Sequence, residues 1–286
     1  MKILFINNSM HLKNKHALYN YGFEIIETYD TNLGNFDLNN FDVVYSPCRP
    51  IDVSKYPNTK FLFGPHFSVF PVKYYMDTII GKNSMYVQPS EWVRDLWKNN
   101  ILCKENRIEA LPFGVDTNKF NENKPISERR DVFIYFKRRK HQELNFMVSF
   151  LQKNGFNPKI FDYVSGYNEH EYIDYLHNSK FAIWITASES QGFALLEALS
   201  CNVPLLVWNV TSLNQEEGSN YIDIPASTIP YWDNRCGEYF TNLNELDDKY
   251  NTFINNLEIY KPREYILENL SFEKCSKKFI DIVNKI

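Results

Sequence analysis

The sequence lacks the features that mark secreted, membrane-spanning and nucleic-acid-binding proteins. Its five cysteines are scattered, odd in number and never in a CxxC pair, so we expect reduced thiols in a cytoplasmic protein. No stretch approaches the ~20 apolar residues of a membrane span, and the apolar run at residues 2–6 is too short for a signal-peptide core. The net charge of −4 and the pI near 5.9 argue against a general nucleic-acid binder.

Apolar and aromatic residues are abundant. Hydrophobic residues make up 44% of the 286 positions, with 22 Phe and 19 Tyr, which indicates a well-packed globular protein. Domains commonly contain ~100–200 residues, so we expect two domains. The two halves of the chain repeat an alternation of strands and helices without a short sequence repeat, which is typical of an α/β fold.

One stretch, residues 181–208, carries the strongest pattern. Phe181 to Ile185 is apolar without interruption, as expected for a parallel strand buried on both faces. From Gly192 onward, apolar residues recur at spacings of three and four, which predicts a helix that ends before Pro204. Leu205 to Trp208 then predicts the next buried strand. This unit is a strand, a loop, a helix and a strand.

Two carboxylates lie in this unit, with seven residues between them. Glu189 follows the C-terminal end of a strand, where open α/β sheets bind ligands. Glu197, on the helix, can accept two hydrogen bonds from vicinal hydroxyls such as a ribose diol. The backbone N–H groups at the helix start suit a phosphate, and Gly192 removes a Cβ where a ligand would approach. The expected donor site therefore includes Ser190, Gln191, Gly192 and Phe193.

The segment SESQGFALLEALSCNVP at residues 188–204 resembles the signature of retaining GT-B glycosyltransferases of the family 4-like group. In that family the first Glu lies beside the donor sugar and the second holds the ribose. PFGVD at residues 112–116, followed four residues later by Phe, resembles the end of the first GT-B domain. The resemblance implies two Rossmann-like domains that face each other across a cleft. The alternative is an ordinary βαβ unit with solvent-facing acids.

The resemblance also implies the domain boundaries. Residues 1–120 would form an acceptor-side domain, completed by a C-terminal helix at 271–286, and residues 121–270 would form the donor domain. Asn121 to Arg130 is polar and predicts a linker. The terminal helix has an apolar stripe with lysines off it, which also leaves open a weak contact with a membrane surface.

A run of cations, LysArgArgLys at 137–140, follows the strand predicted at 131–136. Such a cluster suits a diphosphate, because Arg supplies bidentate bonds and Lys a point charge. GT-B relatives place an Arg and then a Lys here, and Lys137 and Arg139 match them with the order swapped and a shorter spacing, with Arg138 between. The alternatives are a solvated basic turn and a nuclear-localisation signal.

Three further candidates follow predicted strands. His66, after Gly-Pro, resembles a His with which GT-B enzymes touch the donor sugar; the alternative is a packed or surface His. Ser9 lies in the loop after the first strand, where many GT-B enzymes carry paired glycines that this chain lacks. Tyr163 lies in the loop where GT-B enzymes hold the nucleobase, and its ring could stack on a base.

Together these features predict a glycosyltransferase. The resemblance implies that it is a hexosyltransferase. It would move a sugar from a UDP- or GDP-sugar to the hydroxyl of a carbohydrate or glycan acceptor, with retention of configuration. Because no DxD-like pair is placed to hold a metal, we expect no metal and no cofactor. The expected catalytic residues are Glu189, His66, Lys137 and Arg139. A non-catalytic nucleotide-sugar-binding protein and a sugar-nucleotide epimerase are the alternatives, and we expect a monomer or weak dimer.

Overall fold

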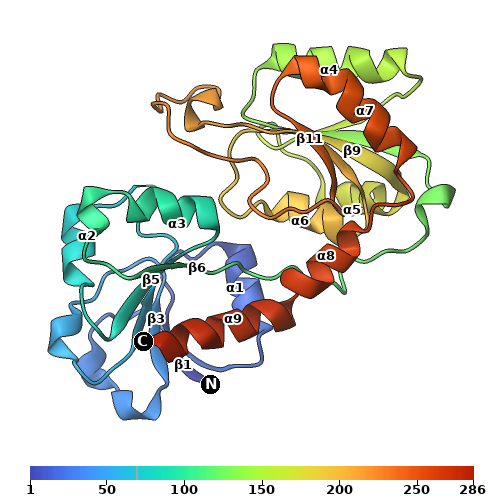
Figure 1. Cartoon of the computed structure of the whole chain (residues 1–286). Coiled ribbons are helices and arrows are strands. Elements are labelled where there is room, and N and C mark those ends of the chain that lie inside the picture. Colours follow the sequence, from blue (N-terminus) through green and yellow to red (C-terminus); the bar gives the residue numbers. More distant parts are fainter. Residues whose placement is uncertain (69) are drawn as a thin grey trace. The chain divides into compact units, whose positions relative to one another are not determined.

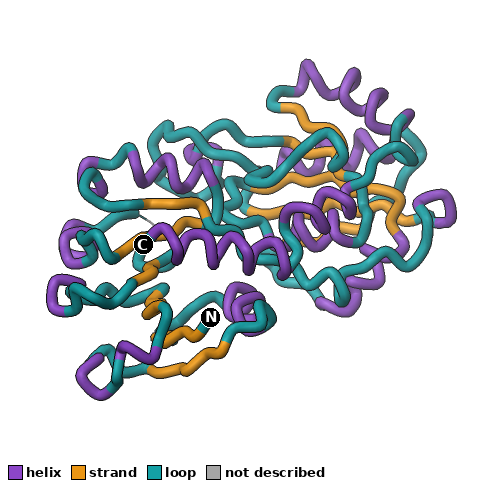
Figure 2. The backbone as a smooth tube through the Cα atoms, turned by 60° about the horizontal axis from the view of Figure 1, so that its bottom comes forward, coloured by secondary structure: helices purple, strands orange, loops and turns teal. Residues whose placement is uncertain are grey.

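The computed structural model describes residues 1–68 and 70–286. The chain divides into two compact units, each with its own parallel sheet (Figure 1). Unit 1 comprises Met1–Gly114 and Phe272–Ile286, and unit 2 comprises Val115–Ser271. In each unit the strands lie between helices, so both units are Rossmann-like (Figure 2).

The sheet of unit 1 has six parallel strands in the order β2-β1-β3-β4-β5-β6. The central strands β1, β3 and β4 are almost entirely buried, which explains their uninterrupted apolar runs. The six strands are Lys2–Ile6, Glu24–Thr28, Val43–Ser46, Phe61–Phe63, Ser84–Gln88 and Ile108–Ala110.

Helices cover both faces of this sheet. Met76 of α2 and Trp97 of α3 pack with Leu4 and Val44 on one face, whereas Phe279 of α9 packs on Tyr45, which points to the opposite face. The helices are α1 (Leu12–Tyr19), α2 (Lys73–Thr78), α3 (Glu91–Lys98) and α9 (Phe272–Lys285), with 3-10 turns at Leu33–Asn35, Leu38–Asn40, Val53–Lys55 and Ile101–Cys103.

Helix α9 joins unit 1 although it comes last in the chain. Its apolar side is buried through Cys275, Phe279, Ile282 and Val283, so this stripe is covered by unit 1. Gly114 lies against Phe272 so closely that a Cβ would come within 2.9 Å of its backbone, which requires glycine there. None of the helices among the described residues is both long and apolar enough to cross a membrane.

The sheet of unit 2 has five parallel strands in the order β11-β10-β9-β7-β8. The strands are β7 (Asp131–Lys137), β8 (Lys159–Asp162), β9 (Ser179–Thr186), β10 (Leu205–Trp208) and β11 (Gly237–Phe240). Alternate residues of β7 and β9 pack under α4 and α7 in one core. On the other face, Tyr135 and Trp184 stack with their ring centroids 4.3 Å apart. The strand, helix and strand expected within 181–208 are confirmed.

The helices of unit 2 are α4 (His141–Lys153), α5 (Glu169–Asn178), α6 (Phe193–Ser200), α7 (Leu246–Asn255) and α8 (Pro262–Asn269), with 3-10 turns at Ile126–Glu128, Leu213–Gln215 and Leu243–Glu245. Residues 121–130, expected as a linker, pack on this unit. Arg129 is fully buried there and donates to the carbonyl oxygens of Lys124 and Cys201 at 2.9 and 3.0 Å. Polar composition alone does not reveal this, because the partners are backbone groups.

Both sheets have the same switch point in their topology. In unit 1 the chain leaves β1 for β2 on one side and returns to β3 on the other, and in unit 2 the strands β7, β8 and β9 repeat this path. Connections on opposite sides diverge at the carboxyl ends of these strands and leave a crevice between them, where open α/β sheets bind ligands. The candidate sites should therefore lie next to β1 and β3 and next to β7 and β9.

Candidate functional site

Lys137 and Glu189 meet at the switch point of unit 2. Lys137 is the last residue of β7 and pairs in register with Thr186, the last residue of β9. Glu189 follows three residues later, so the ends of the two neighbouring strands bring the side chains together. The Lys137 Nζ lies 3.0 Å from each carboxylate oxygen of Glu189. The pair places a cation and an anion where a ligand of the sheet would lie.

The surroundings of Glu189 oppose its negative charge. The residue is 9% exposed, and burial raises the pKa of its carboxyl group, whereas Lys137 and a hydrogen bond from Thr186 act in the opposite direction. Its backbone N–H donates to the carbonyl oxygen of Ser227 at 2.9 Å. Glu189 is therefore held at a fixed place, with a charge that depends on Lys137.

Tyr163 lies on the other side of Lys137. The Lys137 Nζ is 4.6 Å from the centroid of the Tyr163 ring, and half of the tyrosine is exposed. Asp162 shapes this loop, because its carboxylate accepts from the Val164 N–H at 2.9 Å and the Ser165 hydroxyl at 2.7 Å. The exposed ring of Tyr163 is thus presented beside the cation.

The start of α6 completes this group. Gly192 is the N-cap residue, with φ of +72°, a left-handed conformation that favours glycine. A Cβ there would meet neighbouring atoms only at 3.5 Å or more, so the need for glycine comes from the backbone angle rather than from lack of space. Gln191 is buried, Ser190 is exposed and Phe193 begins the helix. The first N–H groups of α6 therefore lie next to Glu189.

Glu197 lies on α6 and is only 4% exposed. Three tyrosines surround it, and burial together with the negative charge of Glu197 raises the pKa of Tyr167 to about 12. The hydroxyls of Tyr135 and Tyr167 are 3.3 Å apart, and the Tyr172 hydroxyl donates to the Ala194 carbonyl oxygen at 2.9 Å. In such a water-poor setting a hydrogen bond to the carboxylate is strong.

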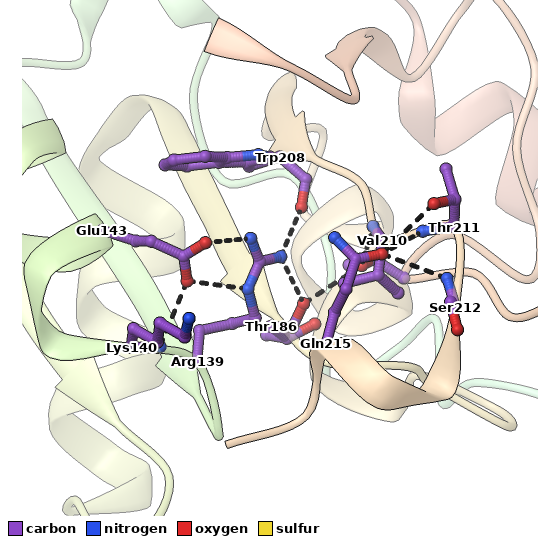
Figure 3. Close-up of polar contacts among 10 residues, drawn as sticks. Arg139, Lys140, Glu143, Thr186, Trp208, Val210, Thr211, Ser212 and Gln215 are labelled. Carbon is purple, nitrogen blue, oxygen red and sulfur yellow. Dashed lines mark hydrogen bonds and ion pairs between the residues drawn. The ribbon is translucent and has the colours of Figure 1, made fainter. Parts of the chain in front are cut away.

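Arg139 has a different environment from Lys137 (Figure 3). It is 1% exposed, and its guanidinium donates to both carboxylate oxygens of Glu143 at 2.6 and 2.9 Å. It also donates to the carbonyl oxygens of Thr186 and Trp208 at 3.4 and 3.3 Å. Arg139 thus braces the ends of three strands from inside the unit, and contact with a diphosphate would require this network to open.

Arg138 contacts a different carboxylate, that of Glu216. Its backbone is left-handed, with φ of +51°, and its exposed guanidinium lies 2.8 Å from the Glu216 carboxylate. The Arg138 carbonyl oxygen accepts from the Glu217 N–H at 2.9 Å. Arg138 therefore fastens the loop between β10 and β11 onto the end of β7. Of the cations at 137–139, only Lys137 is paired with Glu189.

Ser9 and His66 lie in unit 1, where they line a pocket of about 530 Å³. The loops after β1, β2, β3 and β4, together with α2, enclose this cavity, which we call the unit 1 pocket. Ser9 has φ of +65°, a conformation that glycine adopts more readily. The loop after β1 thus makes a left-handed turn without glycine, and Ser9 stores backbone strain at the pocket wall.

His66 contacts a buried asparagine. Its Nε2 lies 3.4 Å from the Asn14 Nδ2, and Asn14 is 3% exposed. Desolvation and the nearby His11 lower the pKa of His66, so the ring is neutral near pH 7. A neutral imidazole can donate from one nitrogen and accept at the other, which suits hydrogen bonding to a sugar hydroxyl.

No protein-family model and no curated protein sequence matches the chain. Solved structures do resemble it. A glycosyltransferase from Rickettsia africae is 15% identical, with a TM-score of 0.63 over 99% of this chain and 98% of that one. The lipopolysaccharide outer core galactosyltransferase WaaB is 14% identical, with a TM-score of 0.55, and Anabaena HepE, in complex with UDP and glucose, is 10% identical, with a TM-score of 0.51; each alignment covers 100% of both chains. The chain has the GT-B fold.

In this GT-B chain, the loop at residues 209–236 supports the site of unit 2. The Asn209 Oδ1 accepts from the Thr228 N–H at 2.8 Å, and the Thr228 hydroxyl donates to the Thr186 carbonyl oxygen at 3.1 Å. Gln215 closes its own turn by accepting from the N–H groups of Thr211 and Ser212 (Figure 3). This support was not predictable from the sequence, because no local periodicity links the loop to β9.

The structure thus brings the predicted residues together in two groups. One group, in unit 2, consists of Lys137, Glu189, Tyr163 and the start of α6 with Glu197 behind it. The other, in unit 1, consists of Ser9 and His66 at the unit 1 pocket. Within residues 1–68 and 70–286, no three His, Cys, Asp or Glu side chains are grouped so that they could hold a metal ion.

Proposed function

We propose that the protein transfers a glycosyl group from a nucleoside-diphosphate sugar to an acceptor hydroxyl. The observation that carries this proposal is the Lys137–Glu189 pair at the switch point of unit 2, beside the start of α6. A cation and the first N–H groups of a helix suit a diphosphate, and the adjacent carboxylate suits the hydroxyls of its sugar. The fold is that of glycosyltransferases with known structures.

Each part of the donor has a matching group in unit 2. Lys137 and the N–H groups of Gly192 and Phe193 would bind the diphosphate, with Ser190 and Gln191 beside them. Glu197 would accept from the ribose diol, since a carboxylate can take two hydroxyl hydrogen bonds. The exposed ring of Tyr163 would stack on the base. We propose UDP or GDP as the nucleotide, and a solved neighbour of the same fold binds UDP.

The chemistry breaks one bond and makes one. The bond between the anomeric carbon and the diphosphate oxygen breaks, a bond from that carbon to the acceptor oxygen forms, and the hydroxyl proton passes to the leaving diphosphate. Negative charge grows on the diphosphate in the transition state, and Lys137 and the α6 N–H groups are placed to stabilise it. We propose that no metal is needed, and that configuration is retained.

Unit 1 would hold the acceptor, a carbohydrate or glycan. The unit 1 pocket is large enough for a sugar ring, and Ser9 and His66 supply hydrogen-bonding groups at its wall. His66 is proposed to contact a sugar hydroxyl through its neutral ring.

The test separates the two glutamates. Purified protein is incubated with UDP- and GDP-sugars, and free nucleotide and new sugar nucleotides are measured. Glu189→Ala should abolish most turnover. Plain UDP or GDP should bind as tightly or more tightly, because Glu189 no longer competes with the diphosphate for Lys137. Glu197→Ala should weaken nucleotide binding about tenfold, because charge-assisted hydrogen bonds to the ribose are lost.

Three outcomes would contradict the proposal. Nucleotide binding without release would indicate a non-catalytic binding protein, and a new sugar nucleotide without release would indicate an epimerase. If neither variant changes binding or rate, the two buried carboxylates do not contact the donor. Treatment with EDTA should leave the rate within about twofold, since fixed cations and a helix end can replace a bound ion; loss of activity that magnesium restores would overturn metal independence.

A further inference from the structure

We infer that the unit 1 pocket recognises an acceptor that carries an oxyanion group, a phosphate or a carboxylate, and that Arg49 reads this group. The inference rests on the proposed function, because it assigns the acceptor to this pocket. It goes further by naming the charge of the acceptor and the residue that selects it.

Arg49 brings an uncompensated positive charge to the wall. It follows β3, lines the pocket and is exposed, and its guanidinium has no ion pair or hydrogen bond among the described residues. None of the described residues at this wall has a carboxylate. Because a guanidinium binds planar oxyanions with two parallel hydrogen bonds, it provides specific recognition of a phosphate or carboxylate.

The carboxylates nearest along the chain have other partners. Asp30, next to the pocket residue Thr31, accepts from the Asn35 Nδ2 at 3.0 Å. Asp52 accepts from the Ser54 hydroxyl at 2.5 Å, and Asp77 forms an ion pair of 2.6 Å with Lys73. These acids are therefore engaged within their own turns, and Arg49 faces the pocket as a cation.

The backbone around Arg49 is fixed. The Ser46 hydroxyl donates to the Arg49 carbonyl oxygen at 2.6 Å, and the His66 N–H donates to the Pro47 carbonyl oxygen at 3.1 Å. Pro50 restricts the residue that precedes it. An ordinary solvated arginine needs no such support, whereas a recognition residue benefits from it, because less conformational freedom is lost on binding.

A second group in the pocket lacks a partner. The Asn8 Nδ2 is shielded from solvent and makes no hydrogen bond within the described part of the chain, and Asn8 lines the same cavity. A buried donor left unpaired costs free energy, so a ligand toward which the Asn8 side chain turns to donate is favoured. Asn8 and Arg49 line the same pocket, so both a donor and a cation are available to an oxyanion there.

The inference is tested by ligand-detected NMR titration of glucose, glucose 6-phosphate and glucuronate into the full chain. The two anionic sugars should bind at least about tenfold more tightly than glucose, which is the usual gain from a charge-assisted pair. Arg49→Gln should remove that preference, and Arg49→Lys should restore part of it. Lys104→Gln, which removes an exposed cation of unit 1 outside the pocket, should leave the preference unchanged.

Each of these outcomes overturns the inference: no preference for either anionic sugar, no sugar binding by the wild type, a preference that persists in Arg49→Gln, and an equal loss in Lys104→Gln. A preference for one anionic sugar alone identifies the group as phosphate or carboxylate. Titrations with UDP and GDP distinguish a failure of this inference from a failure of the proposed function. If Arg49→Gln weakens nucleotide binding as much as sugar-phosphate binding, Arg49 serves the donor and the inference fails. If the wild type binds neither nucleotide but prefers anionic sugars, the proposed function fails and the pocket assignment stands.

Discussion

The two units share a strand order but differ at the carboxyl ends of their sheets. In unit 2 the three cations at 137–139 at the end of β7 each have a carboxylate partner: Lys137 pairs with Glu189, Arg138 with Glu216 and Arg139 with Glu143. In unit 1 the corresponding end is a pocket of about 530 Å³ with Arg49 and the Asn8 amide lacking described partners. The same topology therefore carries a tightly braced site and an open one.

This difference fits two kinds of ligand. A braced site holds its charges in place before the ligand arrives, which lowers the cost of reorganisation when charge develops in a reaction. A pocket with unpaired donors leaves its polar groups to be satisfied by the ligand, so binding depends on what the ligand offers. Unit 2 therefore suits a constant donor group, and unit 1 suits selection among acceptors. Four predictions test this comparison.

The largest expected effect concerns Arg139, which holds three strand ends together. Arg139→Met should lower the free energy of unfolding by about 3 to 5 kcal/mol, because it leaves Glu143 and two strand-end carbonyl oxygens without their buried partner. Urea unfolding followed by circular dichroism measures the loss. Arg138→Met is the matched control: its ion pair is 54% exposed on the arginine side, so removal should cost ~1 kcal/mol or less. Equal losses would show that Arg139 is not a brace.

The adjacent arginines show what the sequence could and could not predict. The strands, α6 and the strand-end positions of Lys137 and Glu189 follow from local apolar patterns, and neighbouring strand ends must meet. The Arg139–Glu143 pair has an i,i+4 spacing that was available as a signal. The Arg138–Glu216 pair was not predictable, because a turn that starts near Leu213 brings Glu216 back to β7 through backbone bonds that have no sequence pattern. The left-handed turn at Ser9 was equally hidden, since serine carries no signal for positive φ.

Lys137→Met should lower turnover at saturating donor by about 10² to 10³, the usual loss when one stabilising donor is removed from a transition state. On the proposed function, the charge that Lys137 would supply to the leaving diphosphate has no equivalent in the variant. Rates of nucleotide release from the donor sugar measure the effect. Lys140→Met removes an exposed cation from the same turn and should keep the rate within about twofold. Similar small losses in both variants would mean that Lys137 does not act on the diphosphate.

A smaller effect is expected in unit 1. His66→Ala should lower turnover by about tenfold to a hundredfold, because one positioned hydrogen bond is worth ~1–3 kcal/mol. Nucleotide binding should stay nearly intact, since the nucleotide is assigned to unit 2. His170→Ala, an exposed histidine of unit 2, is the control and should leave the rate unchanged. Normal turnover in a well-folded His66→Ala protein would make His66 a packing residue.

The smallest effect is a proton taken up when the nucleotide binds. Burial raises the pKa of Glu189, and Lys137 holds it down. When the diphosphate attracts Lys137, the interaction of Lys137 with the Glu189 carboxylate weakens, and the pKa of Glu189 rises further. A group whose pKa is higher in the complex gains protons on binding, so affinity should fall as pH rises through the titration range of Glu189, by less than tenfold per pH unit.

Calorimetry of UDP or GDP binding, in buffers that differ in ionisation enthalpy, counts these protons. The nucleotide's own phosphate also titrates, and the Glu189→Gln variant corrects for it because the same phosphate is present in both titrations. The wild type should take up a fraction of a proton more than Glu189→Gln, at a pH above the ordinary carboxylate range. An equal count would mean that Lys137 keeps its bonds to Glu189 in the complex. Lys137 would then act on the diphosphate from a fixed position. The site of unit 2 would be rigid with and without the nucleotide, and it would differ from the unit 1 pocket even more strongly.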